Sequence, residues 1–101
     1  MKYVSTRGEA PVLGFSDAVL AGLARDGGLY VPREWPRFSA AEIRAMRGLA
    51  YPDLAVRLLA PFLGGEISPA IFEKLAREAY ASFRHEAVCP IVQLGANTFI
   101  L

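Results

Sequence analysis

The segment GLARDGGLYVP, residues 22–32, decides the fold because it marks the change from a helical pattern to an extended one. Its apolar run breaks at Asp26-Gly27-Gly28 and restarts as Leu29-Tyr30-Val31. Phosphate-binding loops run from a strand into the N-terminus of a helix and carry G-x-G-x-x-G or a Walker lysine. Here the order is helix to strand and neither motif is present. We therefore predict a turn in which a glycine takes a positive φ and the chain reverses into a strand.

Three serines predict the starts of helices. Each follows an apolar residue and precedes a helical pattern, as an N-cap with a hydrophobic staple does. The serines are Ser16, Ser39 and Ser68, and the expected staple pairs are Phe15 with Leu20, Phe38 with Ile43, and Ile67 with Phe72. Glu42 completes a capping box with Ser39, and Pro69 takes a first helical position. The expected helices cover residues 17–24, residues 40–47, the stretch from Pro52 to Gly64-Gly65 with Pro61 bending or ending its last turn, and residues 69–84.

The last of these helices has the clearest amphipathic pattern. One apolar stripe is formed by Ile71, Leu75, Ala79 and Phe83, with Phe72, Ala76 and Tyr80 beside it. Its polar residues mix both signs of charge, so it lacks the continuous basic face of a winged-helix recognition element.

Short strands are expected at both ends of the chain. Residues 2–5 form one, and residues 91–94 and 98–101 form a hairpin through Gly95-Ala96-Asn97. The fold class is therefore α+β: a small helical domain with short N-terminal strands and a C-terminal β-hairpin. Because domains seldom end on an unprotected apolar strand, we expect the natural sequence to continue beyond Leu101.

Composition excludes several classes of protein. Of the 101 residues, 53% are hydrophobic, and 11 Lys and Arg balance 10 Asp and Glu to a net charge of +1. Disorder and nucleic-acid binding are thus not expected. No stretch resembles a membrane span or a signal peptide, and the single cysteine allows neither an internal disulfide nor a zinc site. We expect a cytoplasmic protein without a metal.

Few residues could carry chemistry. His85 suits a helix-capping or surface role, and Cys89 a place as small buried filler. Lys74 is expected to face solvent and Lys2 lies at the terminus, so neither is a good Schiff-base amine. Arg7 could bind a phosphate or a carboxylate. The alternative interpretation is a solvated loop arginine that binds neither.

Taken in order, the motifs resemble the N-terminal domain of threonine synthase. The resemblance covers essentially the whole chain and is most specific over residues 3–32. Its first parts are Tyr3-x-Ser5-Thr6-Arg7-Gly8 and Phe15-Ser16-Asp17-Ala18-x-x-x-Gly22-Leu23-Ala24-x-Asp26-Gly27-Gly28-Leu29-Tyr30-Val31-Pro32. Its later parts are Trp35-Pro36, Tyr51-x-x-Leu54-Ala55, Pro61-Phe62-x-Gly64 and Ala79-Tyr80-x-x-Phe83.

The resemblance implies the N-terminal domain of a fold-type-II pyridoxal-phosphate enzyme. Residues 1–87 would be this domain, and the hairpin of residues 88–101 would lead into the catalytic domain of the same chain. The full enzyme would convert O-phospho-L-homoserine and water to L-threonine and phosphate, with chemistry supplied by its cofactor.

The same resemblance assigns roles to residues. The family's Schiff-base lysine follows this hairpin in a Phe-Lys-Asp context that is absent here, so these 101 residues would hold no catalytic residue and no cofactor. Ser5, Thr6 and Arg7 are the candidates for the cleft-facing edge, and Asp26-Gly27-Gly28 is the family signature.

Two other functions stay open at this point. One is a threonine-synthase-like pyridoxal-phosphate enzyme that acts on another phosphorylated hydroxy-amino acid, since the same N-terminal domain would serve both. The other is a stand-alone interaction module.

Overall fold

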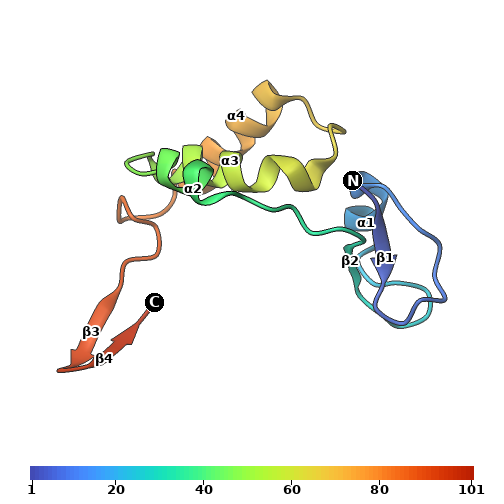
Figure 1. The fold of residues 1–101 in the computed structure, drawn as a ribbon, viewed down its shortest axis with the longest axis horizontal. Helices are drawn as coiled ribbons and strands as arrows, with labels where there is room; N and C mark the ends of the chain where they lie inside the picture. Colours follow the sequence, from blue (N-terminus) through green and yellow to red (C-terminus); the bar gives the residue numbers. More distant parts are fainter.

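The computed structural model describes residues 1–101 as four helices and two separate two-stranded sheets (Figure 1). In chain order the elements are β1 (Tyr3–Ser5), α1 (Phe15–Ala21), β2 (Tyr30–Pro32), α2 (Ala40–Ala45), α3 (Tyr51–Leu63), α4 (Pro69–Tyr80), β3 (Val92–Gly95) and β4 (Thr98–Ile100). The α+β class predicted from the sequence is therefore confirmed. The strands β1 and β2 lie with α1 at one end, the helices α2–α4 in the middle, and the hairpin of β3 and β4 at the other end.

The N-terminal unit is built on the β1–β2 pair. The two strands run antiparallel, with Tyr3 opposite Pro32 and Ser5 opposite Tyr30. Because side chains alternate along a strand, Tyr3 and Ser5 share one face, and both are buried. The ring of Phe15, at the start of α1, lies 6.2 Å from that of Tyr3. The turn of residues 26–28 and the loop after β1 consequently meet at one end of this strand pair.

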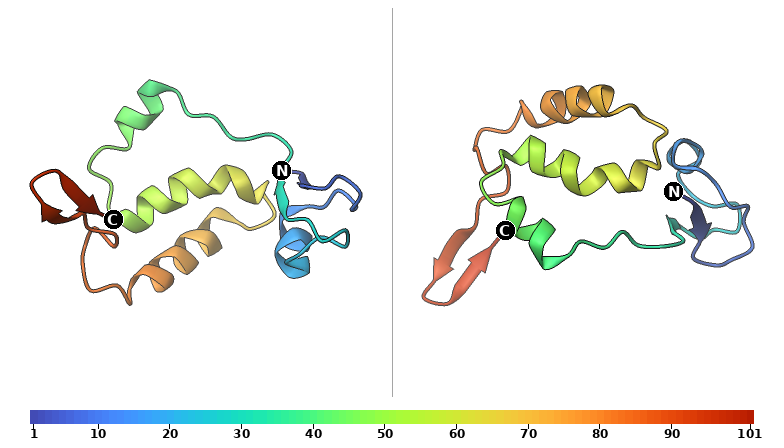
Figure 2. Two further views of the ribbon diagram at one scale, coloured as in Figure 1. Left: turned by 90° about the horizontal axis from the view of Figure 1, so that it is seen from below. Right: turned by 45° about the horizontal axis from the view of Figure 1, so that its top comes forward.

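The helical unit is built on α3 and α4, which lie side by side in both views of Figure 2. Ala55 and Leu63 of α3 and Ala76 of α4 are buried there. Two of the three predicted caps are confirmed: the Ser39 hydroxyl accepts from the Glu42 N–H in a capping box, and Ser68 caps α4. Pro61 lies in the last turn of α3, Leu63 is its last residue, and Gly64 ends it with a left-handed φ of +62°.

The start of α1 differs from the prediction. The helix begins at Phe15 after an N-cap at Gly14, so Ser16 lies inside it and does not cap it. The Glu66 carboxylate, from the α3–α4 loop, accepts hydrogen bonds from the backbone N–H groups of Phe15 at 2.8 Å and Ser16 at 2.9 Å. Leu20 is 85% exposed, which is incompatible with the staple expected for it. A distant carboxylate has replaced the local cap.

Three helices are shorter than predicted. The helix α1 ends at Ala21 because Gly22 takes a φ of +65°, α2 ends at Ala45, and α4 ends at Tyr80. Along α4 the buried position is Ala76, flanked by half-buried Phe72 and Tyr80. The stripe of Ile71, Leu75 and Phe83 is instead about half exposed. The second apolar row therefore packs on α3.

The hairpin is confirmed and stands apart from the helices. Its strands β3 and β4 pair antiparallel with Val92 opposite Ile100, and every residue of both strands is exposed. Cys89, in the segment leading to it, is exposed too, so its expected role as buried filler is wrong. The reason is that this segment leads away from the helices into the exposed hairpin (Figure 1).

The whole arrangement is open. The radius of gyration is 16.7 Å, whereas a compact domain of this length has about 13 Å. Only 10 of the 101 residues are buried, and many large apolar side chains face outward. No helix is long and apolar enough to cross a membrane.

Two sets of hydrogen bonds join the N-terminal unit to the end of α3 and the loop that follows it. One is made by the Glu66 carboxylate at the start of α1, and the other by the Tyr3 hydroxyl, which donates to the Phe62 carbonyl oxygen at 2.8 Å. The Ser16 N–H and hydroxyl and the Phe15 N–H hold the pKa of Glu66 below its ordinary value of 4.5. Because this pKa is lowered on folding, Glu66 stabilises the junction above pH 4.5, and the stabilisation disappears as the pH falls through the lower folded-state value.

We predict that Glu66→Gln loosens this junction at neutral pH, because an amide can offer only one oxygen acceptor to two N–H donors. Hydrogen-exchange protection of the Phe15 and Ser16 amides should fall severalfold in the full-length protein and lose its dependence on acid. Glu78→Gln is the control, since Glu78 makes only an exposed 3.8 Å pair with Lys74. Unchanged protection in Glu66→Gln would contradict the capping role.

Candidate functional site

The candidate site is the place where the loop after β1 meets the turn before β2. It contains both sets of residues singled out in the sequence: Ser5, Thr6 and Arg7 from the loop, and Asp26, Gly27 and Gly28 from the turn. The antiparallel pairing of Ser5 with Tyr30 brings the two sets to the same end of the strands. Two separate sequence motifs thus form one hydrogen-bonded cluster.

The Asp26 carboxylate is the centre of this cluster. Its Oδ1 accepts from the Ser5 hydroxyl at 2.7 Å and from the Gly28 N–H at 2.9 Å, and its Oδ2 accepts from the Glu9 N–H at 3.0 Å. The bond to Gly28, two residues on, is an Asx turn, a common use of Asp before glycine. The bonds to Ser5 and Glu9 add the distant loop to that local turn.

These donors stabilise the charged form of the carboxylate. The Ser5 hydroxyl, with the N–H groups of Gly28, Glu9 and Ala10, lowers the pKa of Asp26 below its ordinary value of 3.8. A lowered folded-state pKa means that the cluster is complete above pH 3.8 and weakens only as the pH falls through the lower value. Asp26 is thus an ionised hydrogen-bond acceptor at neutral pH and is unsuited to act as a general acid there.

The two glycines of the turn serve different purposes. Gly27 has a φ of +75°, which confirms the positive-φ glycine predicted at this turn. Gly28 is buried, and a Cβ placed on it would collide with the Ser5 hydroxyl and come within 3.0 Å of both Asp26 Oδ1 and Thr6 Oγ1. Gly28 is therefore required for close approach of the loop, and Gly27 for the direction of the chain.

The loop residues differ in what they can still bind. Ser5 is 6% exposed and gives its hydroxyl hydrogen to Asp26. The Thr6 Oγ1 accepts from the Leu29 N–H at 3.0 Å. Arg7 is exposed; its Nη1 donates to the Asp26 carbonyl oxygen at 3.0 Å, and no carboxylate lies within ion-pair distance of its guanidinium. Of the three, Arg7 alone keeps a free charge for a ligand.

The other reactive side chains do not converge. His85 lies beyond the end of α4 and accepts the Ala87 N–H on its Nδ1, which is a surface role. Cys89 lies 3.9 Å from the Tyr51 hydroxyl, and this contact raises the pKa of Tyr51. No group of three or more metal-ligating side chains is present. Neither lysine is buried, and the Lys74 side chain is 75% exposed.

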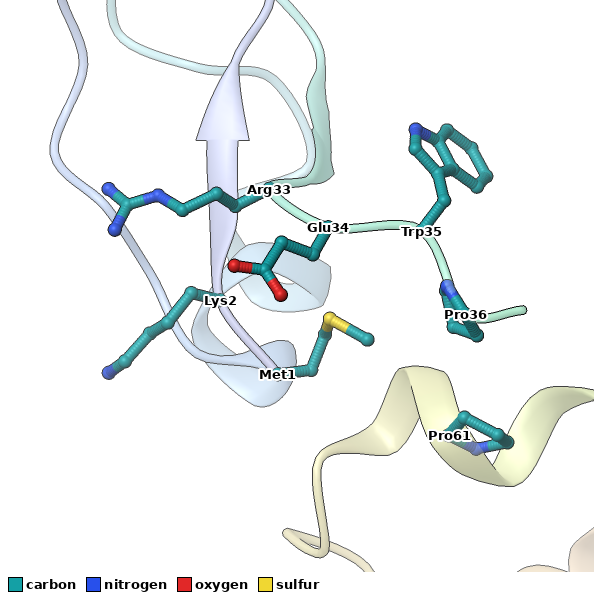
Figure 3. Close-up of a pocket in the computed structure, with 7 residues that line it drawn as sticks. All are labelled: Met1, Lys2, Arg33, Glu34, Trp35, Pro36 and Pro61. Carbon is teal, nitrogen blue, oxygen red and sulfur yellow. The ribbon is translucent and has the colours of Figure 1, made fainter.

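A hollow of about 490 Å³ lies between the strand pair and the end of α3 (Figure 3). Figure 3 shows the charged ends of Lys2 and Arg33 pointing away from Trp35 and Pro61, so these two cations line it with their aliphatic stems. The Glu34 carboxylate lies between them and Met1. The polar groups that line the hollow point in different directions, and we assign no chemistry to this hollow.

Sequence reasoning treated Asp26 as a turn residue and missed its role as an acceptor for a distant loop. The local signal, Asp two residues before a glycine, predicts the Gly28 bond but not those to Ser5 and Glu9. Glu66 carried no signal at all, because its partners lie 50 and 51 residues away.

The fold is that of a small α+β domain in which a hydrogen-bonded turn holds Arg7 exposed and without a carboxylate partner. Comparison with known proteins identifies its relatives. A family model described as the N terminus of threonine synthase matches residues 2–80.

Relatives agree with this match. Threonine synthase of Pseudomonas aeruginosa is 52% identical over 101 residues, which is 100% of this chain and 22% of that protein. Human threonine synthase-like 2 is 39% identical over 102 residues, covering 100% of this chain and 21% of that protein. The crystal structure of threonine synthase from Brucella melitensis with bound PLP superposes with a TM-score of 0.92 and 67% identity, over 99% of this chain and 22% of that one.

The chain belongs to the threonine synthase family and corresponds to its N-terminal domain. It spans about a fifth of the length of these relatives. The resemblance inferred from the ordered motifs is confirmed.

We predict that Ser5→Ala raises the pKa of Asp26 toward 3.8, because it removes the hydrogen bond that contributes most to lowering it. A ¹³C NMR titration of the Asp26 carboxyl carbon would measure the change. Thr6→Val is the matched control, since the Thr6 hydroxyl bonds Leu29 and not Asp26. An unshifted titration in Ser5→Ala would show that the cluster is not held as described.

Proposed function

We propose that these residues form the N-terminal domain of a pyridoxal-phosphate-dependent threonine synthase that converts O-phospho-L-homoserine and water to L-threonine and phosphate. The observation that carries the proposal is the 67% identity and 0.92 TM-score to the PLP-bound enzyme of Brucella melitensis. The reaction is that of a carbon–oxygen lyase acting on a phosphate ester. The threonine synthases of Brucella melitensis and Pseudomonas aeruginosa, at 67% and 52% identity, support this substrate.

The residues present do not fit a cofactor site. Pyridoxal phosphate needs a lysine amine that is desolvated or otherwise lowered in pKa. Lys2 is exposed, and the Lys74 amine faces solvent beside Glu78. The Schiff-base lysine and the cofactor therefore belong to the catalytic domain that follows this one in the full-length enzyme.

Packing against that catalytic domain is the main role of residues 1–87. The proposal is supported by exposed apolar side chains next to the Asp26 cluster, on α1 and the turn: Val19, Leu20, Leu23 and Leu29, each 58–85% exposed. Isolated domains rarely leave so much apolar surface uncovered without a partner. The hairpin of residues 88–101, whose strands β3 and β4 are exposed throughout, would lead into the catalytic domain.

Ser5, Thr6 and Arg7 form the edge that faces the active-site cleft in this proposal. Ser5 and Thr6 shape the loop, because their hydroxyls are used inside the cluster. Arg7 binds the phosphate of the substrate, since a guanidinium matches phosphate oxygens in charge and geometry. Two observations support this role of Arg7. Its guanidinium is held by a hydrogen bond to the Asp26 carbonyl oxygen, and it has no carboxylate partner.

The decisive experiment is an assay of the full-length protein with O-phospho-L-homoserine. Release of inorganic phosphate together with L-threonine is the expected result. A protein that binds pyridoxal phosphate but releases phosphate only from another phosphorylated hydroxy-amino acid would contradict the assigned substrate.

For the residues, Arg7→Ala should raise the KM for O-phospho-L-homoserine about 10- to 100-fold, as expected for loss of a charge-assisted hydrogen bond of about 1.5–3 kcal/mol. Arg7→Lys should be intermediate, because an ammonium keeps the charge but not the fork. Arg37→Ala, which removes an exposed arginine with no hydrogen-bonded or ion-pair partner, is the control. An unchanged KM in Arg7→Ala would remove Arg7 from the site.

A further inference from the structure

We propose that Asp26 and Gly27 act as positioning residues that hold the Arg7 guanidinium ready for an anionic group before any ligand arrives. The inference rests on the proposed role of Arg7 in phosphate binding. It adds the residues that fix where the Arg7 guanidinium lies. It assigns a function to the Asp-Gly-Gly turn, which makes no contact with a ligand in this account.

The first observation is how Asp26 divides its oxygen atoms. Its carboxylate accepts from Ser5, Gly28 and Glu9, and only its backbone carbonyl oxygen accepts from the Arg7 guanidinium, at 3.0 Å. An aspartate beside an arginine commonly forms an ion pair with it. Here the carboxylate is occupied by other donors, so Arg7 is held without being neutralised.

The second observation is that Asp26 fixes the backbone on both sides of Arg7. Ser5 and Glu9 flank the arginine at two residues on either side, and both are bonded to the carboxylate. The backbone N–H of Arg7 itself donates to the Ser5 hydroxyl oxygen at 3.1 Å. The loop is therefore tied to the turn at positions 5, 7 and 9, and Arg7 projects from a fixed base.

The third observation concerns Gly27. A Cβ built on this residue would lie 3.2 Å from Arg7 Nη1 and 3.5 Å from the guanidinium carbon. The guanidinium therefore lies across the open face of the glycine. A methyl group at position 27 would push the guanidinium away by a few tenths of an ångström, in addition to straining a backbone with a φ of +75°.

Such an arrangement raises affinity through preorganisation. A free arginine side chain loses part of its rotamer entropy when it binds a ligand. Ordering the side chain beforehand removes part of that cost from the binding step. The expected ligand is a phosphate or phosphonate group, for which the remaining N–H donors of the fork are available.

The test compares Asp26→Asn in two backgrounds of the full-length enzyme, with Arg7 present and with Arg7→Ala. With Arg7 present, the KM for the phosphorylated substrate and the inhibition constant for inorganic phosphate should each rise about tenfold, with kcat changed by less than about threefold. In Arg7→Ala the same substitution should add less than about twofold, because residues that act through one another are not additive.

A second variant keeps the test independent of how well Asp26→Asn folds. Gly27→Ala should weaken inorganic phosphate binding, measured by calorimetry, about as much as Asp26→Asn does. Gly22→Ala is its matched control: Gly22 also has a positive φ, of +65°, but a Cβ there meets nothing within 4 Å. It adds a methyl group at another positive-φ glycine without touching Arg7, and phosphate binding should stay at the wild-type level.

The outcomes separate this inference from the proposed function. If Arg7→Ala weakens phosphate binding while Asp26→Asn and Gly27→Ala do not, the positioning role is overturned and the role of Arg7 stands. Equal effects of Asp26→Asn in both backgrounds, or of Gly27→Ala and Gly22→Ala, would also overturn it, because they indicate general loss of stability. Wild-type binding in Arg7→Ala would overturn both.

Discussion

The carboxylate of Asp26 is the constraint on which the N-terminal unit depends. It gathers the hydroxyl of Ser5 and the N–H groups of Glu9 and Gly28 at distances of 2.7–3.0 Å, and it thereby closes the loop after β1 onto the turn before β2. The burial of Ser5 at 6% exposure is acceptable because its hydroxyl is satisfied by this carboxylate. Without it, the loop that carries Arg7 would be joined to the turn mainly by the Thr6–Leu29 bonds and its own arginine.

A second carboxylate performs a comparable task between the two halves of the domain. Glu66 caps α1 from the α3–α4 loop, and with the Tyr3–Phe62 bond it sets the N-terminal unit against the end of α3. Polar bonds are prominent here because the apolar core is small: the chain buries few large side chains and exposes many. Such a domain needs little internal core if it is completed by packing against a larger body, which is what the proposed catalytic domain supplies.

Features that depend on interactions between residues close in sequence could be predicted, whereas those that depend on distant residues could not. The caps at Ser39 and Ser68, the end of α3 at Gly64 and the C-terminal hairpin depend on neighbours within a few residues, and all were confirmed. The start of α1 was predicted wrongly because its capping group lies about 50 residues away, in Glu66. The helix–strand turn at Asp26 was predictable, whereas its bond to Ser5, 21 residues earlier, was not. The exposure of Cys89 was missed for a related reason. An apolar segment predicts burial, but the sequence does not say whether the burial comes from the same domain or from another one.

The central claim is that the turn at Asp26 presents a charged, ordered Arg7 to a phosphate group. A crystal structure of the full-length enzyme with a non-reactive phosphonate analogue of O-phospho-L-homoserine would test it most directly. The account predicts a phosphonate oxygen about 2.7–3.0 Å from the Arg7 guanidinium while Nη1 keeps its bond to the Asp26 carbonyl oxygen. A bound phosphonate with Arg7 turned into solvent, or with Arg7 paired to a carboxylate elsewhere in the chain, would contradict it.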